Sequence, residues 1–289
     1  MKLRALLIGP LGAVIGFPLA IAASVSVAAP PARSARASVL LPIQRFRFDA
    51  GAPLLAPAAV AEDGTLCVGT ADGYVHSLNA DGSYRWSHSV PGAIRRRPLH
   101  VGGLWYLATS GARVVALRAE GTVAWVFKAP SEVNSELAAD ADGTAYFVGV
   151  DRFLYGLTAH GAVTVRAPFG APKAGPERGT DGAIWAENQR GELFQVRARR
   201  VRRVGPEQHG PGVFSDARIL TDPEGHEWQG RSDGVLEFRD GRSAGVRELA
   251  LAQSPLFAPI WSRAAQYAVL STRSGLVFAL QPVSTSPGR

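Results

Sequence analysis

The sequence predicts an all-β fold, a single β-propeller of six four-stranded blades. Three observations lead to it: strand-like segments recur with a period near 40 residues, both faces of the third strand in each unit are largely apolar, and glycine turns separate the strands. A period of about 40 residues built only from strand signals is typical of propeller blades. Two apolar faces are expected because each blade is packed between two neighbours.

The period is anchored on the apolar residue that closes the third strand of each unit. Successive anchors are 39, 40, 39, 42 and 42 residues apart, and they are Leu78, Leu117, Leu157, Val196, Phe238 and Leu280. The residue before the anchor is mostly small, as at Ser77 and Ala116, which fits a close approach between blades. A seventh blade would need a degenerate unit within 207–254, where the spacings leave little room.

A second strand lies about eleven residues before each anchor, beginning with Leu66–Gly69 in the first unit. Asp63-Gly64 precedes this strand, and Asp72-Gly73 separates it from the third strand. Glycine tolerates the positive φ that such tight turns require. The turns therefore predict antiparallel hairpins within each unit.

The two ends of the repeat region suggest how the ring closes. The sixth unit stops after three strands, and an unassigned strand, Ile43–Phe48, precedes the first unit. A propeller that did not close would leave an unpaired sheet edge. We therefore expect the N-terminal strand to complete the last blade, with Phe46 and Phe48 as its anchoring side chains.

The first unit, from Ala61 to Trp86, reads AEDGTLCVGTADGYVHSLNADGSYRW. This pattern resembles the propeller repeat of the pyrroloquinoline-quinone (PQQ) type: DGT, an apolar strand, a DG turn, a second strand, another turn and a tryptophan. The resemblance covers residues 41–281, and the fourth and fifth units match least. It implies that the family tryptophan, here Trp86 and Trp125, docks between blades.

PQQ-dependent dehydrogenases share this type of repeat, but the sequence differs from theirs in several features. Those enzymes are larger and eight-bladed, and they use calcium, a catalytic Asp and commonly two adjacent cysteines. This chain has one cysteine, Cys67, in a predicted core strand. We expect no bound PQQ or other cofactor and no metal site. The family also includes a lipoprotein of the outer-membrane barrel-assembly machinery, whose lipid-bearing cysteine has no counterpart after the apolar N-terminal run.

The N-terminus reads as an export signal at residues 1–29. Lys2 and Arg4 precede an uncharged run that ends in the small residues Val27-Ala28-Ala29, as expected at a cleavage site. Residues 30–40 then form a predicted disordered lead-in, 41–281 the propeller and 282–289 a loose tail. The alternative is a retained anchor in the inner membrane, because the run is long enough to span a bilayer. Either reading places the propeller in the periplasm or outside the cell.

No catalytic motif is present. The six histidines form no metal-binding pattern, and neither a nucleophile elbow nor a phosphate-binding loop occurs in the predicted propeller. We therefore assign no catalytic residue. The net charge of +7 is compatible with an anionic ligand. The absence of an RNA-binding motif and of a basic helix speaks against nucleic acid.

Propeller geometry predicts a ligand site on the loops that join each outer strand to the next inner strand. These loops are 89–97, 129–136, 167–177 and 206–216. Their candidate binding residues are Arg95, Arg97, Glu132, Asn134, Glu136, Lys173, Glu177, His209 and Asp216.

Three functions remain open. The first is a monomeric binding or scaffold module of the cell envelope, whose partner is another envelope protein or an anionic ligand. The second is an enzyme at the channel mouth, such as a lyase, hydrolase or sugar oxidoreductase, which requires two converging titratable groups with displaced pKa values. The third is a periplasmic sensor, against which the lack of an attached signalling domain counts.

Overall fold

The computed structural model of the chain describes residues 41–133, 135–205, 219–239 and 246–282. All of them belong to one compact unit, Val39–Arg289. The predicted export signal, the lead-in and residues 283–289 of the predicted tail lie outside the described residues. Every regular element in the described ranges is a strand, so they contain no helix that could span a membrane.

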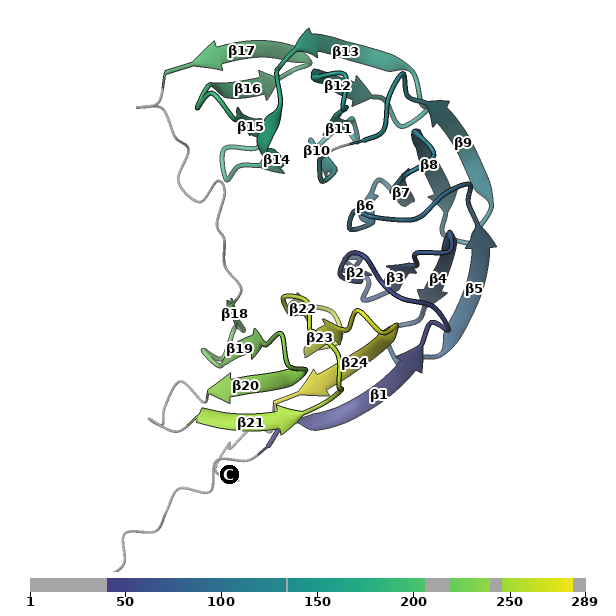
Figure 1. Ribbon diagram of the computed structural model, residues 1–289, viewed down its shortest axis with the longest axis vertical. Coiled ribbons are helices and arrows are strands. Elements are labelled where there is room, and N and C mark those ends of the chain that lie inside the picture. Colours follow the sequence, from purple (N-terminus) through teal and green to yellow (C-terminus); the bar gives the residue numbers. More distant parts are fainter. Residues whose placement is uncertain (1–40, 134, 206–218, 240–245, 283–289) are drawn as a thin grey trace, which may run out of the picture. The chain divides into compact units, whose positions relative to one another are not determined.

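The strands form six four-stranded antiparallel sheets, here called blades 1 to 6 (Figure 1). Blade 1 contains β2 (Ala59–Val60), β3 (Leu66–Gly69), β4 (Tyr74–Leu78) and β5 (Tyr84–Ser89). Blade 2 contains β6 (Leu99–Val101), β7 (Leu104–Thr109), β8 (Arg113–Arg118) and β9 (Val123–Lys128). Blade 3 contains β10 (Ala138–Ala139), β11 (Ala145–Val148), β12 (Phe153–Leu157) and β13 (Val163–Pro168).

Blades 4 to 6 follow the same order from the inner strand to the outer strand. Blade 4 contains β14 (Pro172–Arg178), β15 (Ile184–Asn188), β16 (Leu193–Arg197) and β17 (Arg200–Val204). Blade 5 contains β18 (Ile219–Thr221), β19 (Glu227–Gly230), β20 (Val235–Arg239) and β21 (Val246–Ala250). Blade 6 contains β22 (Ile260–Ser262), β23 (Tyr267–Ser271), β24 (Leu276–Gln281) and the N-terminal β1 (Ile43–Asp49). The prediction of six four-stranded blades is confirmed.

Blade 6 is built from both ends of the propeller segment. Its strand order is β1-β24-β23-β22, and Figure 1 shows β1 lying along β24. The pairing is antiparallel, with Phe46 opposite Ala279 and Phe48 opposite Val277. The N-terminal strand therefore completes the last blade, as the sequence predicts.

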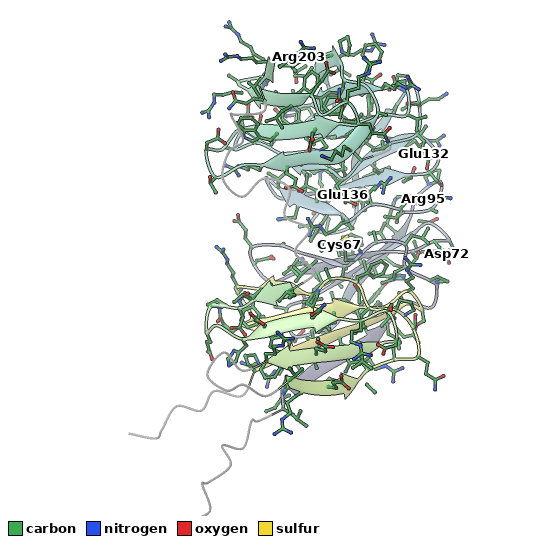
Figure 2. The ribbon with its side chains drawn as sticks, turned by 60° about the vertical axis from the view of Figure 1, so that its left-hand side comes forward. Cys67, Asp72, Arg95, Glu132, Glu136 and Arg203 are labelled. Carbon is green, nitrogen blue, oxygen red and sulfur yellow. The ribbon has the colours of Figure 1, made fainter. Side chains whose placement is uncertain are left out.

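The core lies between the blades, because the middle strands are buried on both faces. Every residue of β3, β11 and β23 is buried. Cys67 of β3, labelled in Figure 2, packs in an apolar cluster with Trp105 of blade 2. Similar clusters join blades 2 and 3, 3 and 4, 5 and 6, and 6 and 1. Each large side chain that is fully buried in this way contributes about 1.5–3 kcal/mol.

The register of blade 5 differs by one residue from the predicted repeat. The Gly73 N–H donates to the Thr70 carbonyl in the hairpin of blade 1, and the Gly234 N–H donates to the Arg231 carbonyl at the same place in blade 5. The equivalent of the anchor Leu78 is therefore Arg239, not Phe238 as the sequence suggested. A slip of one residue exchanges the two faces of a strand, so the correction decides which side chains face each neighbouring blade.

Candidate functional site: a cavity lined by inner strands

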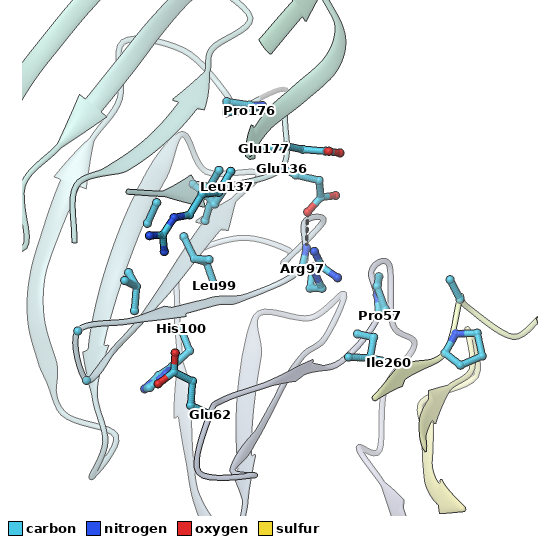
Figure 3. Close-up of a pocket in the computed structure, with 18 residues that line it drawn as sticks. Pro57, Glu62, Arg97, Leu99, His100, Glu136, Leu137, Pro176, Glu177 and Ile260 are labelled. Atoms are coloured by element: carbon cyan, nitrogen blue, oxygen red, sulfur yellow. Dashed lines mark hydrogen bonds between the residues drawn. The ribbon is translucent and has the colours of Figure 1, made fainter. Parts of the chain in front are cut away.

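A cavity of about 780 Å³ lies where the inner strands of blades 1 to 4 and blade 6 meet (Figure 3). Its lining comprises Pro57, Glu62, Arg97, Leu99, His100, Val101, Gly102, Gly103, Glu136, Leu137, Ala138, Ala139, Pro176, Glu177, Arg178, Ala258, Pro259 and Ile260. Binding cavities for small ligands occupy roughly 300–1,000 Å³. The cavity is therefore large enough to take a small molecule or a short segment of a partner protein.

One charged side of the cavity is formed by loops of blades 2 and 3. The main-chain N–H of Arg97 donates to Oε2 of Glu136 at 3.0 Å, the contact drawn as a dashed line in Figure 3. Blade 4 approaches closely here, since a Cβ on Gly175 would lie 3.0 Å from the Glu136 nitrogen. Burial raises the pKa of Glu136, and the positive charges of Arg97 and Arg96 offset this effect only in part.

A second polar group at the cavity is the His100 imidazole. Its ring centroid lies 4.6 Å from that of Trp105. Burial lowers the pKa of His100, while the acidic side chains of Asp63 and Glu62 act in the opposite direction. The cavity thus brings together a carboxyl group that holds its proton more tightly than usual and an imidazole that holds its proton less tightly.

The remaining wall is apolar and comes from different blades. Pro57 and Ile260 lie on the side of blades 1 and 6, and Leu137 and Pro176 lie on the side of blades 3 and 4 (Figure 3). Proline rings have little conformational freedom to lose on binding. A ligand that fits this cavity therefore combines an apolar body with charged or hydrogen-bonding groups.

Three of the predicted binding residues, Arg97, Glu136 and Glu177, line this cavity together. Arg95 and Glu132 do not line it, and Figure 2 shows them near the edge of the molecule while Glu136 lies closer to its middle. The predicted binding residues are thus divided between the cavity and the outer surface of the loops.

Two predicted residues lie in a strand rather than in a loop. Lys173 and Glu177 belong to β14, although 167–177 was expected to be a connecting loop. Lys173 Nζ forms an ion pair with Glu187 Oε1 at 2.8 Å on the neighbouring strand. β14 contains Pro172 and Pro176, but it is an edge strand, where a missing N–H need not break the sheet.

The other predicted residues, Asn134, His209 and Asp216, lie outside the described residues. Sequence reasoning did not select Glu62, His100 or Arg178, which also line the cavity. Glu62 directly precedes the Asp63-Gly64 turn, and the other two belong to inner strands. A search for charged residues within and beside the inner strands would have found them.

Two tryptophans contact the following blade through hydrogen bonds. Trp86 Nε1 donates to the Ala119 carbonyl at 2.7 Å, from blade 1 to blade 2. Trp125 Nε1 donates to the Ala159 carbonyl at 2.7 Å, from blade 2 to blade 3. Each indole therefore spans a joint between adjacent blades.

Phe46 occupies the corresponding place in blade 6. It lies opposite Ala279, just as Trp86 lies opposite Ser77. A Cβ on Gly82 of blade 1 would lie 2.2 Å from the Phe46 ring, so this ring covers the glycine of a blade 1 turn. The sequence after β24 contains no tryptophan, and Phe46 of the N-terminal strand supplies an aromatic ring at the corresponding place.

Comparison with known proteins bears on both the repeat and the fold. Residues 44–181 match a family described as "Outer membrane protein assembly factor BamB". No curated protein matches the sequence. Among solved structures, the chain is similar to BamB from Moraxella catarrhalis, with 15% identity and a TM-score of 0.49, over 88% of this chain and 94% of that chain. It is also similar to the Pan2 WD40 domain of Neurospora crassa, with 10% identity and a TM-score of 0.62, over 86% of this chain and 97% of that chain.

The comparisons bear on the architecture and leave the activity open. The similarity to the Pan2 domain, at 10% identity, shows the propeller fold alone, and 1426 chains of solved structures match in total. The family match is more specific for the repeat, because residues 44–181 contain blades 1 to 3. The chain is a β-propeller, and its residues 44–181 resemble the PQQ-like repeat.

Proposed function

We propose that this chain is an exported binding and scaffold module of the cell envelope, which works without PQQ and holds its partner at the inner-strand cavity. The observation that carries the proposal is that cavity, in which Arg97, Glu136 and Glu177 stand beside apolar walls from several blades. Partner proteins are commonly anchored by a few side chains in such partly apolar pockets. The match to a family described as an outer membrane protein assembly factor supports a protein partner.

The location in the envelope rests on the sequence. Residues 1–29 have the composition of an export signal, with Val27-Ala28-Ala29 at the expected cleavage site. The description of the matched family also concerns the outer membrane. If the signal is cleaved, the mature chain begins at Pro30. The mass of the purified chain distinguishes this outcome from a retained N-terminal anchor.

Site-specific photo-crosslinking tests the binding role. A photoreactive amino acid at Leu99, in the cavity, is expected to capture a partner in intact cells. The same amino acid at Tyr84, an exposed position on β5, is the matched control. Adducts at Leu99 should weaken when Arg97→Glu changes the charge of the cavity. A chain that gives no adduct at Leu99, or the same adducts at both positions, would contradict the proposal.

The second candidate is an enzyme at this cavity, because Glu136 and His100 line it with pKa values displaced in opposite directions. Such a pair can supply a general acid and a general base. A lyase or hydrolase activity would be abolished by Glu136→Gln and by His100→Asn, and it would survive Glu132→Gln. If turnover of sugar or ester substrates is absent, or is indifferent to Glu136→Gln, the cavity is not an active site.

A further inference from the structure

The hairpins between the second and third strands of the blades share a polar position, the third residue of the turn. In blade 1 this residue is Asp72, whose carboxylate accepts a hydrogen bond from the Thr70 hydroxyl. In blade 3 it is Asp151, whose carboxylate accepts one from the Tyr155 hydroxyl. Figure 2 shows Asp72 near the edge of the molecule, so this hairpin reaches the surface.

Three further hairpins also contain their own hydrogen-bond acceptor. In blade 5 Asp233 stands at the third position and pairs with Arg231 at 2.6 Å. In blade 6 Ser274 stands there and shares a hydrogen bond of 2.9 Å with Thr272. In blade 4 the side-chain oxygen of Asn188, at the first position, accepts hydrogen bonds from two N–H groups of the same turn.

The hairpin of blade 2 has Gly111 at the third position and therefore lacks this acceptor. Thr109, the counterpart of Thr70, is only 2% exposed, yet its hydroxyl has no hydrogen-bond partner among the described residues. The Arg113 guanidinium takes the place of the missing side chain, because a Cβ on Gly111 would lie 3.0 Å from Nη1 of Arg113. This hairpin thus presents a cation where those of blades 1, 3 and 5 present a carboxylate.

A second cation stands next to Arg113. Lys128 of β9 lies directly opposite Arg113 of β8, which in turn lies opposite Thr109 of β7. Arg113 is half-buried and Lys128 is exposed, and neither forms an ion pair with another described residue. Like charges directly opposite each other on neighbouring strands are destabilising. A bound anion would convert this repulsion into two attractive contacts.

The surroundings of these two cations within blade 2 contain no acidic residue. Residues 90–98, 109–113 and 127–131 include neither aspartate nor glutamate. Glu136 lines the inner-strand cavity and interacts electrostatically with Arg97 and Arg96. Asp72 of blade 1 interacts electrostatically with His76. These two carboxylates of the neighbouring blades therefore act on other groups.

We propose that Thr109, Arg113 and Lys128 form a binding site for a carboxylate side chain of an acidic protein segment, which completes the hairpin of blade 2 as Asp72 completes that of blade 1. The planar guanidinium can hold a carboxylate through two N–H donors, and the ammonium group adds a point charge. The Thr109 hydroxyl is a further donor. None of these three residues lines the inner-strand cavity, so the site goes beyond the proposed function.

A protein segment fits this site better than a broad anionic surface does. The positive charge is local, because Asp72 and Asp151 stand in the hairpins of the blades on either side. A single acidic side chain can reach between these hairpins, whereas a lipid bilayer would meet charges of both signs. Val150 in the hairpin of blade 3 is 54% exposed and offers an apolar contact to the rest of such a segment.

Binding of an aspartate-rich peptide to the full-length chain tests the site, with the same peptide carrying asparagine as the control ligand. Arg113→Gln with Lys128→Gln should weaken binding of the aspartate peptide at least about tenfold, as expected when hydrogen bonds to a charged group are lost. Arg200→Gln with Arg202→Gln removes the same charge from exposed positions on β17 and should weaken it less than about twofold. Bound peptide should slow hydrogen exchange in 110–113 and leave 273–275 of blade 6 unchanged.

Thr109→Val separates binding from folding. The valine keeps the shape of the side chain and removes a buried hydroxyl that has no partner, so the unbound chain should resist urea at least as well as the unmodified chain. The same change should weaken binding of the aspartate peptide about threefold, because one hydrogen-bond donor is lost. A variant that loses stability and binds the peptide unchanged would remove Thr109 from the site.

Three results would overturn the proposal. One is equal binding of the aspartate and asparagine peptides, a comparison that needs only the unmodified chain. Another is an equal loss of binding in the two double variants. The third is binding to vesicles of anionic lipid that depends on Arg113 and Lys128 in a chain that does not bind the peptide, which would assign the site to a membrane surface. Crosslinking at Leu99 reports on the cavity, so the two proposals can fail independently.

Discussion

Single residues show that three joints between blades share one contact, an aromatic ring over a turn glycine. Trp86 covers Gly121, where an added Cβ would lie 2.6 Å from the ring. Trp125 covers Gly161 in the same way, at 2.8 Å. These glycines thus have two roles, because each also adopts a positive φ, +88° at Gly121. The indole sets the distance between blades, and the glycine is the only residue that leaves room for it.

A matched pair of alanine substitutions separates these two roles. Gly121→Ala introduces a positive-φ alanine and a clash with Trp86, whereas Gly225→Ala, with φ of +87°, meets nothing within 4 Å. Both variants lose about 1 kcal/mol from the backbone conformation. Gly121→Ala should lose a further 1–3 kcal/mol, roughly, from overpacking. Urea unfolding measures the difference in the free energy of unfolding. Equal losses for the two variants would show that the Trp86 ring moves aside without an energetic cost.

The raised pKa of Glu136 predicts a pH-dependent cost to folding. The folded chain holds this proton more tightly than the unfolded chain, because burial disfavours the carboxylate. The unmodified protein should therefore lose stability as the pH rises from the ordinary carboxyl range through the raised pKa. Glu136→Gln removes this loss, so its stability relative to the unmodified protein should increase over that range and then level off.

Thermal melts from pH 4 to pH 8 test this expectation for Glu136→Gln. Glu132→Gln removes the same charge from the same loop and serves as the control. A stability difference that decreases with pH for Glu136→Gln would show that Arg97 and Arg96 outweigh the burial of the carboxyl group.

At the scale of single strands, sequence reasoning succeeded where apolar residues repeat and failed where they do not. The middle strands of blades 1 to 4 and 6 follow the predicted columns. In blade 5 the true anchor is Arg239, a charged residue where the other blades have an apolar one. An alignment of the six units by their apolar residues therefore places the anchor at Phe238, one residue before its true position.

The candidate site was predictable only in part, for a related reason. Arg97 and Glu136 lie in loops whose position follows from the order of the strands. The inner strands β2 and β10 contain two residues each, too few for a period to be recognised. β14 has seven residues, but Pro172 and Pro176 conceal it. Among the residues of these strands, spacing assigned Glu177 to the cavity but did not assign Arg178, Ala138 or Ala139.

The outer strand β1 has the local irregularity of the outer strands in blades 1 to 3. Its register shifts between Gln44 and Phe46, which leaves Arg45 unpaired as in a β-bulge. The outer strand of blade 1 shifts at the equivalent place, beside Trp86. In both blades the bulge directs an aromatic ring toward the next blade. The ring is Trp86 in blade 1, and it is Phe46 in blade 6, where the two ends of the propeller segment pair.

Phe46→Ala tests the contribution of this strand. The ring is half-buried, lies 5.8 Å from that of Tyr267, and covers Gly82. Its removal should lower the free energy of unfolding by about 2–3 kcal/mol, less than for a fully buried phenylalanine. Arg45→Ala, at the exposed bulge residue, should change stability by less than about 0.5 kcal/mol. Similar losses in urea unfolding for the two variants would mean that Phe46 is not the anchor of β1.

At the scale of the whole molecule, the two ends of the propeller segment meet within blade 6, where β1 pairs with β24. The chain then runs from β1 directly into β2 of blade 1. The joint between blades 6 and 1 is also apolar: Leu54, Leu66 and Val277 share one cluster. The N-terminal strand therefore connects blade 6 to blade 1 both through the chain and through packing.

This double connection predicts the effect of removing the N-terminal strand. Deletion of residues 39–50 takes away β1, Phe46 and Phe48, and it exposes the edge of β24 and the adjoining face of blade 1. Each blade is stabilised by its neighbours, so the loss should spread, and the single cooperative thermal transition expected of the intact propeller should disappear. Deletion of residues 283–289, the predicted loose tail, should leave that transition near the temperature of the full chain. Calorimetry of both variants measures the difference. A cooperative transition retained after deletion of 39–50 would show that five complete blades and a three-stranded sheet are sufficient, and that β1 adds a contact without holding the propeller together.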